Sequence, residues 1–202
     1  TSELDRWRKQ YLLFCRVATR NHRGNLHVNS LRALGSTATV PKDAFFGCRT
    51  LKLTHLPEGI TAIKEWAFSN CVALALTQLP SGVTTIGRYA FGQCNALALT
   101  HLPEGLTMIR DSAFENCHAL ALTQLPHGIA TVKEEAFSNC RSLALTQLPE
   151  AVTTIGKNAF VHCYQLALTH LPEGLTTIEY GAFNGCLALA LTHLPEGITT
   201  IA

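Results

Sequence analysis

The sequence predicts a strand-dominated α/β solenoid, a stack of short coils preceded by an N-terminal helical cap. Three observations lead to this expectation: single cysteines, Ala-Phe pairs and prolines each recur along the chain with the same 23-residue step. A fixed period of 20–50 residues is typical of stacked repeat arrays, because one coil cannot enclose a core of its own. The repeated cysteines are Cys48, Cys71, Cys94, Cys117, Cys140, Cys163 and Cys186.

The composition excludes two other classes of chain. Of the 202 residues, 47% are apolar and 15% are charged, with a formal net charge of +2. A disordered tail needs far fewer apolar residues and a larger net charge. Thr, His, Gln, Pro and Glu interrupt every apolar run well before the roughly 18 residues of a membrane-spanning helix. We therefore expect a folded repeat domain.

The first 43 residues differ from the rest. Residues 1–43 carry eight Lys and Arg against three Asp and Glu, whereas residues 44–202 carry eight against eleven. Within the first segment, apolar residues recur at helical spacing between Leu4 and Ala18. We expect a basic helix that caps the first coil, followed by a degenerate first coil over 26–43. The alternative is a helix that contacts nucleic acid, a membrane surface or a partner protein.

Residues 44–202 are expected to form seven repeats, the last one incomplete, and each repeat has the same predicted elements. The segment 97–103 has strand length and ends in proline, so we expect its copies to pair in one parallel sheet. Residues 66–71 are long enough only for a turn or two of helix. The glycine two residues after each proline is expected in a tight turn with positive φ. These glycines are Gly59, Gly82, Gly105, Gly128, Gly174 and Gly197.

The repeat resembles a known family at nearly every defining position. Units such as residues 102–109, Leu-Pro-Glu-Gly-Leu-Thr-Met-Ile, followed by Ala113-Phe114 and Cys117, resemble the BspA-type (Treponema pallidum type) leucine-rich repeat. The resemblance covers residues 44–202. It implies a right-handed, curved superhelix with its parallel sheet on the concave face, used in bacterial surface proteins and protist proteins to bind macromolecules.

One departure from the family leaves the direction of the strand side chains open. The family places an aliphatic residue six positions after the cysteine, where this chain has Thr54 and its equivalents. Here the leucine comes one position earlier, at Leu53. Because a strand alternates faces with every residue, either residue could face the core.

The repeated cysteines have three interpretations. Seven single cysteines lack the clustered donors that a tetrahedral zinc site requires. Disulfides between neighbouring coils are an alternative, but an odd number of cysteines and the low cost of burying a thiol favour small structural thiols. Free thiols favour a reducing compartment slightly, whereas the family resemblance also allows the cell surface, so localisation stays open.

Two sets of exposed positions are candidate binding residues. A polar row is expected on one face of the strands, since polar ladders on a sheet face are usually solvent-exposed; the alternative is that these side chains only stack on one another. The row comprises His55, Gln78, His101, Gln124, Gln147, His170 and His193. Positions that vary between repeats form the second set, since large amphipathic residues favour contact surfaces; the alternative is simple drift of exposed loops. These are Trp66, Tyr89, Arg110, Tyr164 and Tyr180.

The sequence predicts a binding module and no enzyme. It has no phosphate-binding loop, no clustered carboxylate pair and no nucleophile with its own base. We expect a scaffold for a protein partner, with no catalytic residue, cofactor, metal or small-molecule substrate. The alternative is a structural or adhesive segment of a longer surface array, and an uncapped C-terminal coil would allow end-to-end self-association.

Overall fold

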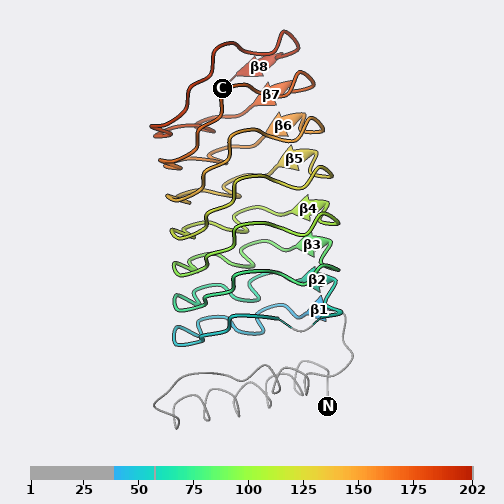
Figure 1. Ribbon diagram of the computed structural model, residues 1–202, viewed down its shortest axis with the longest axis vertical. Helices are drawn as coiled ribbons and strands as arrows, with labels where there is room; N and C mark the ends of the chain where they lie inside the picture. The colour runs from blue at the N-terminus through green and yellow to red at the C-terminus, as the bar shows by residue number, and fades with distance from the viewer. Residues whose placement is uncertain (1–38, 57, 202) are drawn as a thin grey trace.

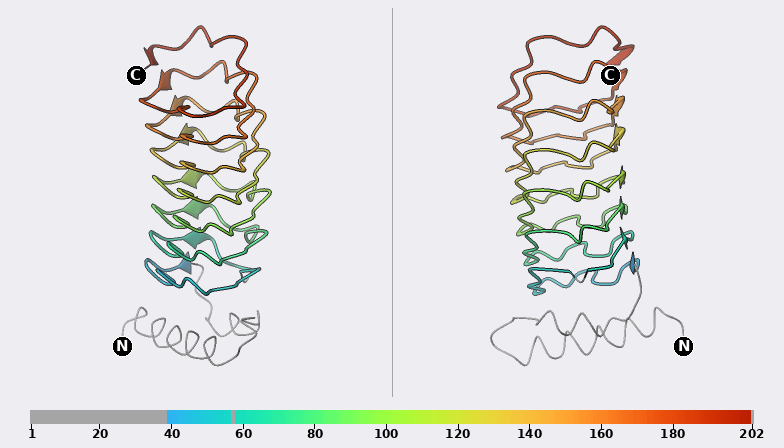
Figure 2. Two further views of the ribbon diagram at one scale, coloured as in Figure 1. Left: turned by 90° about the vertical axis from the view of Figure 1, so that its left-hand side faces the viewer. Right: turned by 45° about the vertical axis from the view of Figure 1, so that its right-hand side comes forward.

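The computed structural model describes residues 39–56 and 58–201, which form a parallel β-solenoid of about seven turns (Figure 1). Each turn contributes one strand of only two residues, and the strands lie one above another along one side of the stack (Figure 2). The strands are β1 (Thr39–Val40), β2 (Ala62–Ile63), β3 (Thr85–Ile86), β4 (Met108–Ile109), β5 (Thr131–Val132), β6 (Thr154–Ile155), β7 (Thr177–Ile178) and β8 (Thr200–Ile201).

Neighbouring strands pair in parallel and in the register of the repeat, as Val40 with Ile63 and Ile63 with Ile86. This register places Val40 in the same row as Ile63, while residues 26–38 of the expected degenerate coil lie outside the described residues. The prediction of a single sheet is wrong, because strand pairing stops between β4 and β5 and leaves two sheets of four strands each. Elsewhere the amide of the residue after a strand donates to the last carbonyl of the preceding strand, as Arg110 N does to Ile86 O at 3.0 Å. Within the described residues, Lys133 N, which follows β5, makes no such bond.

The strands do not occupy the segment that we predicted. Residues 97–103 and their copies have no strand structure in the described part of the chain, and only one or two backbone bonds link a copy to the coil below, for example from Ala121 N to Leu99 O at 3.1 Å. The reason lies in the spacing of the leucines. Leu97, Leu99 and Leu102 are all buried, and a straight strand would place Leu102 on the opposite face from the other two. A bend at Thr100 brings all three inward.

This bend also settles which residue faces the core. Leu53, Leu76 and Leu99 are buried, whereas the threonines that follow them are exposed. The leucine therefore occupies the core position, and the threonine after it faces the solvent.

The helical turns expected around residues 66–71 are absent, since residues 39–56 and 58–201 contain no helix. Amide groups of this segment bond alternately within the coil and to the coil above. Phe91 N donates to Ala113 O at 2.9 Å and Gly92 N donates to Tyr89 O at 3.1 Å. A helix would direct every amide along its own chain, so this alternation replaces it. The predicted helical cap lies outside the described residues, and no described helix is long and apolar enough to cross a membrane.

For its amides to bond alternately within the coil and to the next coil, the backbone needs two residues per coil in the left-handed region of φ. In one coil these are Tyr89, with φ of 52°, and Gln93, with φ of 62°. The predicted positive φ after each proline is wrong for five of the six glycines, because only Gly59 adopts it, at 90°. The strained positions thus precede the Ala-Phe pair and the cysteine. The corresponding residues are Asp43, Trp66, Tyr89, Ser112, Glu135, Asn158 and Gly181, and then Gly47, Asn70, Gln93, Asn116, Asn139, His162 and Gly185.

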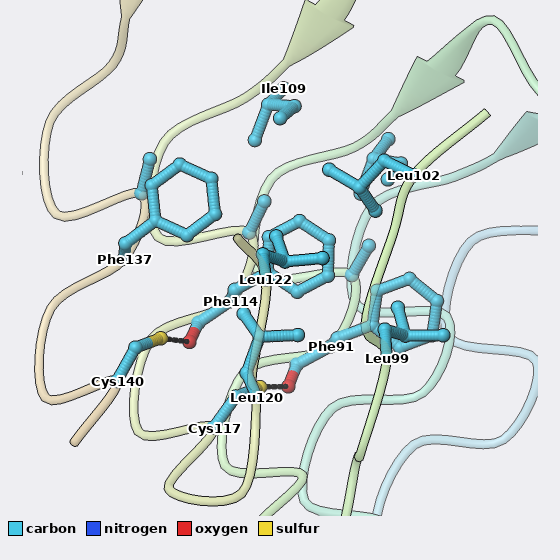
Figure 3. Close-up of a cluster of buried hydrophobic side chains, with 14 of the residues drawn as sticks. Phe91, Leu99, Leu102, Ile109, Phe114, Cys117, Leu120, Leu122, Phe137 and Cys140 are labelled. Atoms are coloured by element: carbon cyan, nitrogen blue, oxygen red, sulfur yellow. Dashed lines mark hydrogen bonds between the residues drawn. The ribbon is translucent and has the colours of Figure 1, made fainter. Parts of the chain in front are cut away.

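The core is built from repeated rows of side chains that stack along the axis (Figure 3). The phenylalanine of each Ala-Phe pair lies parallel to the next, from Phe45 to Phe183, with ring centroids 5.0–5.7 Å apart and interplanar angles of 1–7°. These distances are within the range of offset-stacked aromatic pairs. Burial of rings and leucines in unbroken rows supplies the hydrophobic stabilisation that a single coil lacks.

The repeated cysteines from Cys71 onward are free thiols, buried as far as Cys163 and half-buried at Cys186. Each from Cys71 onward donates its Sγ–H to the carbonyl oxygen of the phenylalanine 26 residues earlier, as Cys117 does to Phe91 at 3.1 Å (Figure 3). Burial raises the pKa of the thiols from Cys94 onward, to about 12 at Cys94 and about 11 at Cys186. They are therefore protonated, unreactive structural groups at neutral pH.

Candidate interaction surfaces

The polar row from His55 to His193 is exposed along its whole length. It lies away from the strands, directly after the bend that follows each buried leucine, so its description as a strand face is wrong. All four of its histidines bond through Nδ1 to the Oγ1 of the preceding threonine, at 2.9 Å for Thr54–His55 and 3.0 Å for Thr192–His193. These bonds fix the rings, so that Nε2 is the atom left for other contacts.

The row does not assemble a metal site within the described residues. His193 Nε2 lies 3.9 Å from Glu173 Oε1 on the coil below, which is an ion pair only when the imidazole is protonated. No group of three or more His, Cys, Asp or Glu side chains in residues 39–56 and 58–201 is arranged to hold a metal ion. The row is a ladder of hydrogen-bonding groups.

The structure brings together only two of the five variable candidates. The rings of Trp66 and Tyr89 stack at a centroid distance of 4.1 Å and an interplanar angle of 14°. Arg110 and Tyr180 are exposed, and neither belongs to the Trp66–Tyr89 ring pair. Tyr164, also exposed, lies against the ring of His162 at 5.9 Å. The other candidates are therefore separate surface residues.

Phe46 extends this stack by a third ring, which the sequence analysis missed. Its ring meets Trp66 edge to face at 6.0 Å, and 51% of the residue is exposed. Phe46, Trp66 and Tyr89 together are called the aromatic ledge. Phe46 follows an Ala-Phe pair where other repeats have Ser69 or Gly92, and this lone aromatic residue was the available signal.

Polar groups hold the ledge in place. Trp66 Nε1 donates to Glu65 Oε1 at 2.9 Å, while Lys42 Nζ pairs with Glu65 Oε2 at 3.1 Å. The hydrogen bond from Lys42 is the largest cause that lowers the pKa of Glu65, followed by that from Trp66. The Arg88 guanidinium lies over the Tyr89 ring, 5.3 Å from its centroid. The ledge is thus ordered before any ligand arrives.

The fold does not require aromatic residues at the ledge. Trp66 and Tyr89 have φ of 57° and 52°, in a region that Asn, Asp and Gly enter at lower cost than bulky residues. The same position carries Asp43, Asn158 and Gly181 in other coils. The core is complete beneath the ledge, where Phe68 and Phe91 are fully buried. Trp66 and Tyr89 therefore serve the surface.

Two carboxylates occupy the same rows further along the stack. Ser112 Oγ donates to Glu135 Oε2 at 3.3 Å, and Asn116 Nδ2 donates to Glu115 Oε1 at 2.9 Å. Both glutamates are half-buried. Burial, with the charge of Glu135 as a second cause, raises the pKa of Glu115. The sequence analysis missed this pair because the two residues are 20 positions apart, and only the coil geometry makes them neighbours.

Comparisons with known proteins agree with this architecture. The model of the BspA type leucine rich repeat region matches residues 23–144 and 100–202 in six copies. The chain therefore belongs to the family of BspA-type leucine-rich repeat proteins. No curated protein gives a significant match.

Several solved structures share the fold. The leucine-rich repeat protein of T. pallidum is 34% identical, with a TM-score of 0.59 over 77% of this chain and 69% of that one. A leucine-rich repeat protein from Bacteroides ovatus is 30% identical, with a TM-score of 0.66 over 77% of this chain and 42% of that one. A third from Eubacterium ventriosum, 22% identical with a TM-score of 0.53 over 79% and 53%, shows the fold alone.

Proposed function

We propose that the protein is a non-catalytic scaffold that binds a protein partner, with the aromatic ledge as its contact surface. The observation that carries this proposal is the exposure of Phe46 beside the Trp66–Tyr89 stack, above a core that is already closed. Large aromatic residues dominate the energetics of protein interfaces. Leucine-rich repeat solenoids in general use extended surfaces to bind other proteins.

A non-catalytic role is supported by repetition. The four histidines of the polar row share one repeat position and the same threonine partner, and the thiols from Cys71 onward recur in every coil with the same carbonyl partner. A reaction centre needs groups that differ from their surroundings in geometry and pKa. Such repetition is what a scaffold requires.

Partner capture tests the proposal. The bait is residues 1–202, compared with a ledge variant carrying Phe46→Ser, Trp66→Ser and Tyr89→Ser, and with a matched control carrying Tyr164→Ser and Tyr180→Ser. We expect a partner that the control retains and the ledge variant loses, confirmed by a Kd with the purified partner. Equal capture by all three baits, or by none, contradicts the ledge as the contact surface.

Two further variants separate the rival surfaces. A change of the seven His and Gln residues of the polar row to Glu would abolish capture only if recognition lies on that row. Deletion of residues 1–25 would abolish it only if the basic N-terminal segment supplies specificity. Circular dichroism of each variant checks that the repeats remain folded.

A second candidate function is a structural or adhesive segment of a longer surface array. It is favoured by the regularity of the stack, in which successive coils repeat the same backbone bonds, such as Phe91 N to Ala113 O and Phe137 N to Ala159 O, both at 2.9 Å. Because every coil presents the same groups to its neighbours, copies of such an array can also associate with one another. Light scattering across a hundredfold range of concentration tests this candidate. A mass that stays monomeric throughout counts against it, whereas concentration-dependent growth supports it.

A further inference from the structure

Two rows of the surface run side by side along the solenoid and meet the ledge. The Trp66 row contains Asp43, Trp66, Tyr89, Ser112, Glu135, Asn158 and Gly181, and the Glu115 row contains Phe46, Ser69, Gly92, Glu115, Ser138, Val161 and Asn184. The rows lie three residues apart in each coil and are tied by backbone bonds, such as that from Glu115 N to Ser112 O at 3.1 Å. Over the first coils the rows are aromatic, and over the next two they are acidic.

We infer that these rows form one docking strip for an extended peptide segment, whose apolar side chain lies on the aromatic ledge and whose arginine lies between Glu115 and Glu135. The inference rests on the proposed function and specifies the chemistry of the partner. The strip spans five coils from Phe46 to Glu135, about 20 Å at about 5 Å per coil. An extended peptide covers this length with about six residues.

The two carboxylates lack a cation of their own. The ion pairs of the described residues are Lys42–Glu65, Lys157–Glu134 and His193–Glu173, and none involves Glu115 or Glu135. Two half-buried carboxylates side by side repel each other and lose hydration. A partner's cation relieves both costs, which makes this end of the strip complementary to positive charge.

Arginine fits the pair better than lysine or a metal ion does. Asn116 and Ser112 hold one oxygen of each carboxylate, which leaves the remaining oxygens for a partner. A guanidinium presents several N–H groups in a planar fork that matches fixed carboxylates, whereas an ammonium is a point charge. A metal ion would need a third ligand, and the described residues do not provide one.

The charge around the strip favours a single arginine over a polybasic run. Arg88 occupies a face of the Tyr89 ring, and Arg110 and Lys133 are exposed nearby in sequence. A run of positive charges would meet these groups, whereas one arginine flanked by neutral residues reaches the carboxylates alone. Tyr89 and Glu115 lie on adjacent coils, so an apolar residue and an arginine two positions apart on an extended peptide match their separation.

A displayed library of twelve-residue peptides provides the test. The full chain is used to select binders, and the consensus is synthesised as a fluorescent probe for anisotropy measurements. We expect an apolar residue two positions from an arginine. Binding is expected to weaken at least tenfold in the Glu115→Gln, Glu135→Gln variant, and at least fivefold when lysine replaces the probe's arginine.

A matched variant excludes a simple effect of net charge. Glu104→Gln with Glu150→Gln removes the same two charges from exposed positions outside the strip, and it should bind the probe within twofold of the unchanged chain. Glutamine keeps the oxygen that Asn116 bonds, so the strip variant should stay folded by circular dichroism. A consensus without arginine, or equal weakening in both variants, overturns the inference.

Failure of this inference is distinguishable from failure of the scaffold proposal. If the captured partner is lost on removal of the ledge but retained by Glu115→Gln, Glu135→Gln, the scaffold proposal stands and the arginine strip is wrong. Loss of the same partner from both variants supports the strip.

Discussion

The thiol of Cys117 donates a hydrogen bond to the carbonyl oxygen of Phe91, 3.1 Å away on the coil below. The same oxygen accepts the amide of Cys94 at 3.1 Å, so a single carbonyl joins a turn to its neighbouring coil. The repeat conserves cysteine at this place because a small apolar side chain with a weak donor fits it.

Replacement of Cys117 by alanine should therefore destabilise the fold. The change removes a fully buried sulfur atom and its hydrogen bond, and we expect the free energy of unfolding to fall by about 1–2 kcal/mol. Urea denaturation followed by circular dichroism measures it. The same change at half-buried Cys186 should cost less, and equal losses at both sites would contradict the role of burial.

Alkaline pH should destabilise the protein. Burial raises the pKa of the thiols above the value of about 8.5 that they have in the unfolded chain, to about 11 at Cys186 and about 12 at Cys94. Above pH 9 the unfolded chain therefore loses protons that the folded chain retains. Each such thiol lowers the free energy of unfolding by up to about 1.4 kcal/mol per pH unit. Urea titrations at pH 7, 9 and 10 measure the slope, and Cys94→Ala should reduce it; a flat profile would contradict the shifts.

The central phenylalanine should matter more than any exposed aromatic residue. Phe114 is fully buried and stacks on Phe91 and Phe137. Phe114→Ala should lower the free energy of unfolding by about 3–5 kcal/mol, the usual cost of a large cavity. Tyr180→Ala, at an exposed position, is the control and should change it by less than about 0.5 kcal/mol. Guanidinium denaturation gives both values.

One substitution should stabilise the protein. Gln93 adopts φ of 62°, at a position where three other repeats have asparagine. Asparagine enters this region more readily than glutamine does, so Gln93→Asn should raise the free energy of unfolding by about 0.5–1 kcal/mol. Thermal melts detect the change. Gln93→Val, with a branched side chain, should lower the melting temperature; a rise with valine would show that backbone strain is not the cause.

The break between β4 and β5 should be visible in hydrogen exchange. Arg110 N and Gly156 N donate to the coil below at 3.0 and 2.8 Å, whereas the amide of Lys133 makes no such bond in the described structure. Amides without a backbone acceptor exchange at lower opening cost. NMR-detected exchange at neutral pH should show Lys133 exchanging at least tenfold faster than the other two, and equal protection would indicate a continuous sheet.

Periodicity was sufficient to predict the solenoid, its core rows and its free thiols. The step of 23 residues places Phe68 over Phe91 and Cys71 near Cys94 without any knowledge of dihedral angles. The path within a coil was harder to predict. The strand was placed at residues 97–103 on length and proline alone, and the spacing of Leu97, Leu99 and Leu102 that bends this segment was overlooked.

The surface was predictable in part, for a related reason. Trp66 and Tyr89 were found because they vary between repeats. Phe46 lies in a row that is otherwise mostly small or polar, and its contact with Trp66 depends on the fold. Glu115 and Glu135 were missed because we compared one repeat position at a time, and these two residues occupy different repeat positions on neighbouring coils. Contacts between rows require the geometry of the coil.

The direction of the backbone bonds has a consequence for how such a chain can change. Amides around the Ala-Phe pairs donate hydrogen bonds to the following coil, whereas amides beside the strands donate to the preceding coil. Every coil therefore presents the same donors and acceptors to its two neighbours. Removal of residues 94–116 would join equivalent positions and preserve every type of bond. The ledge and Tyr164 would then stand one coil closer together. The number of repeats in such a chain therefore sets the distance between two contact sites, and neither site has to change.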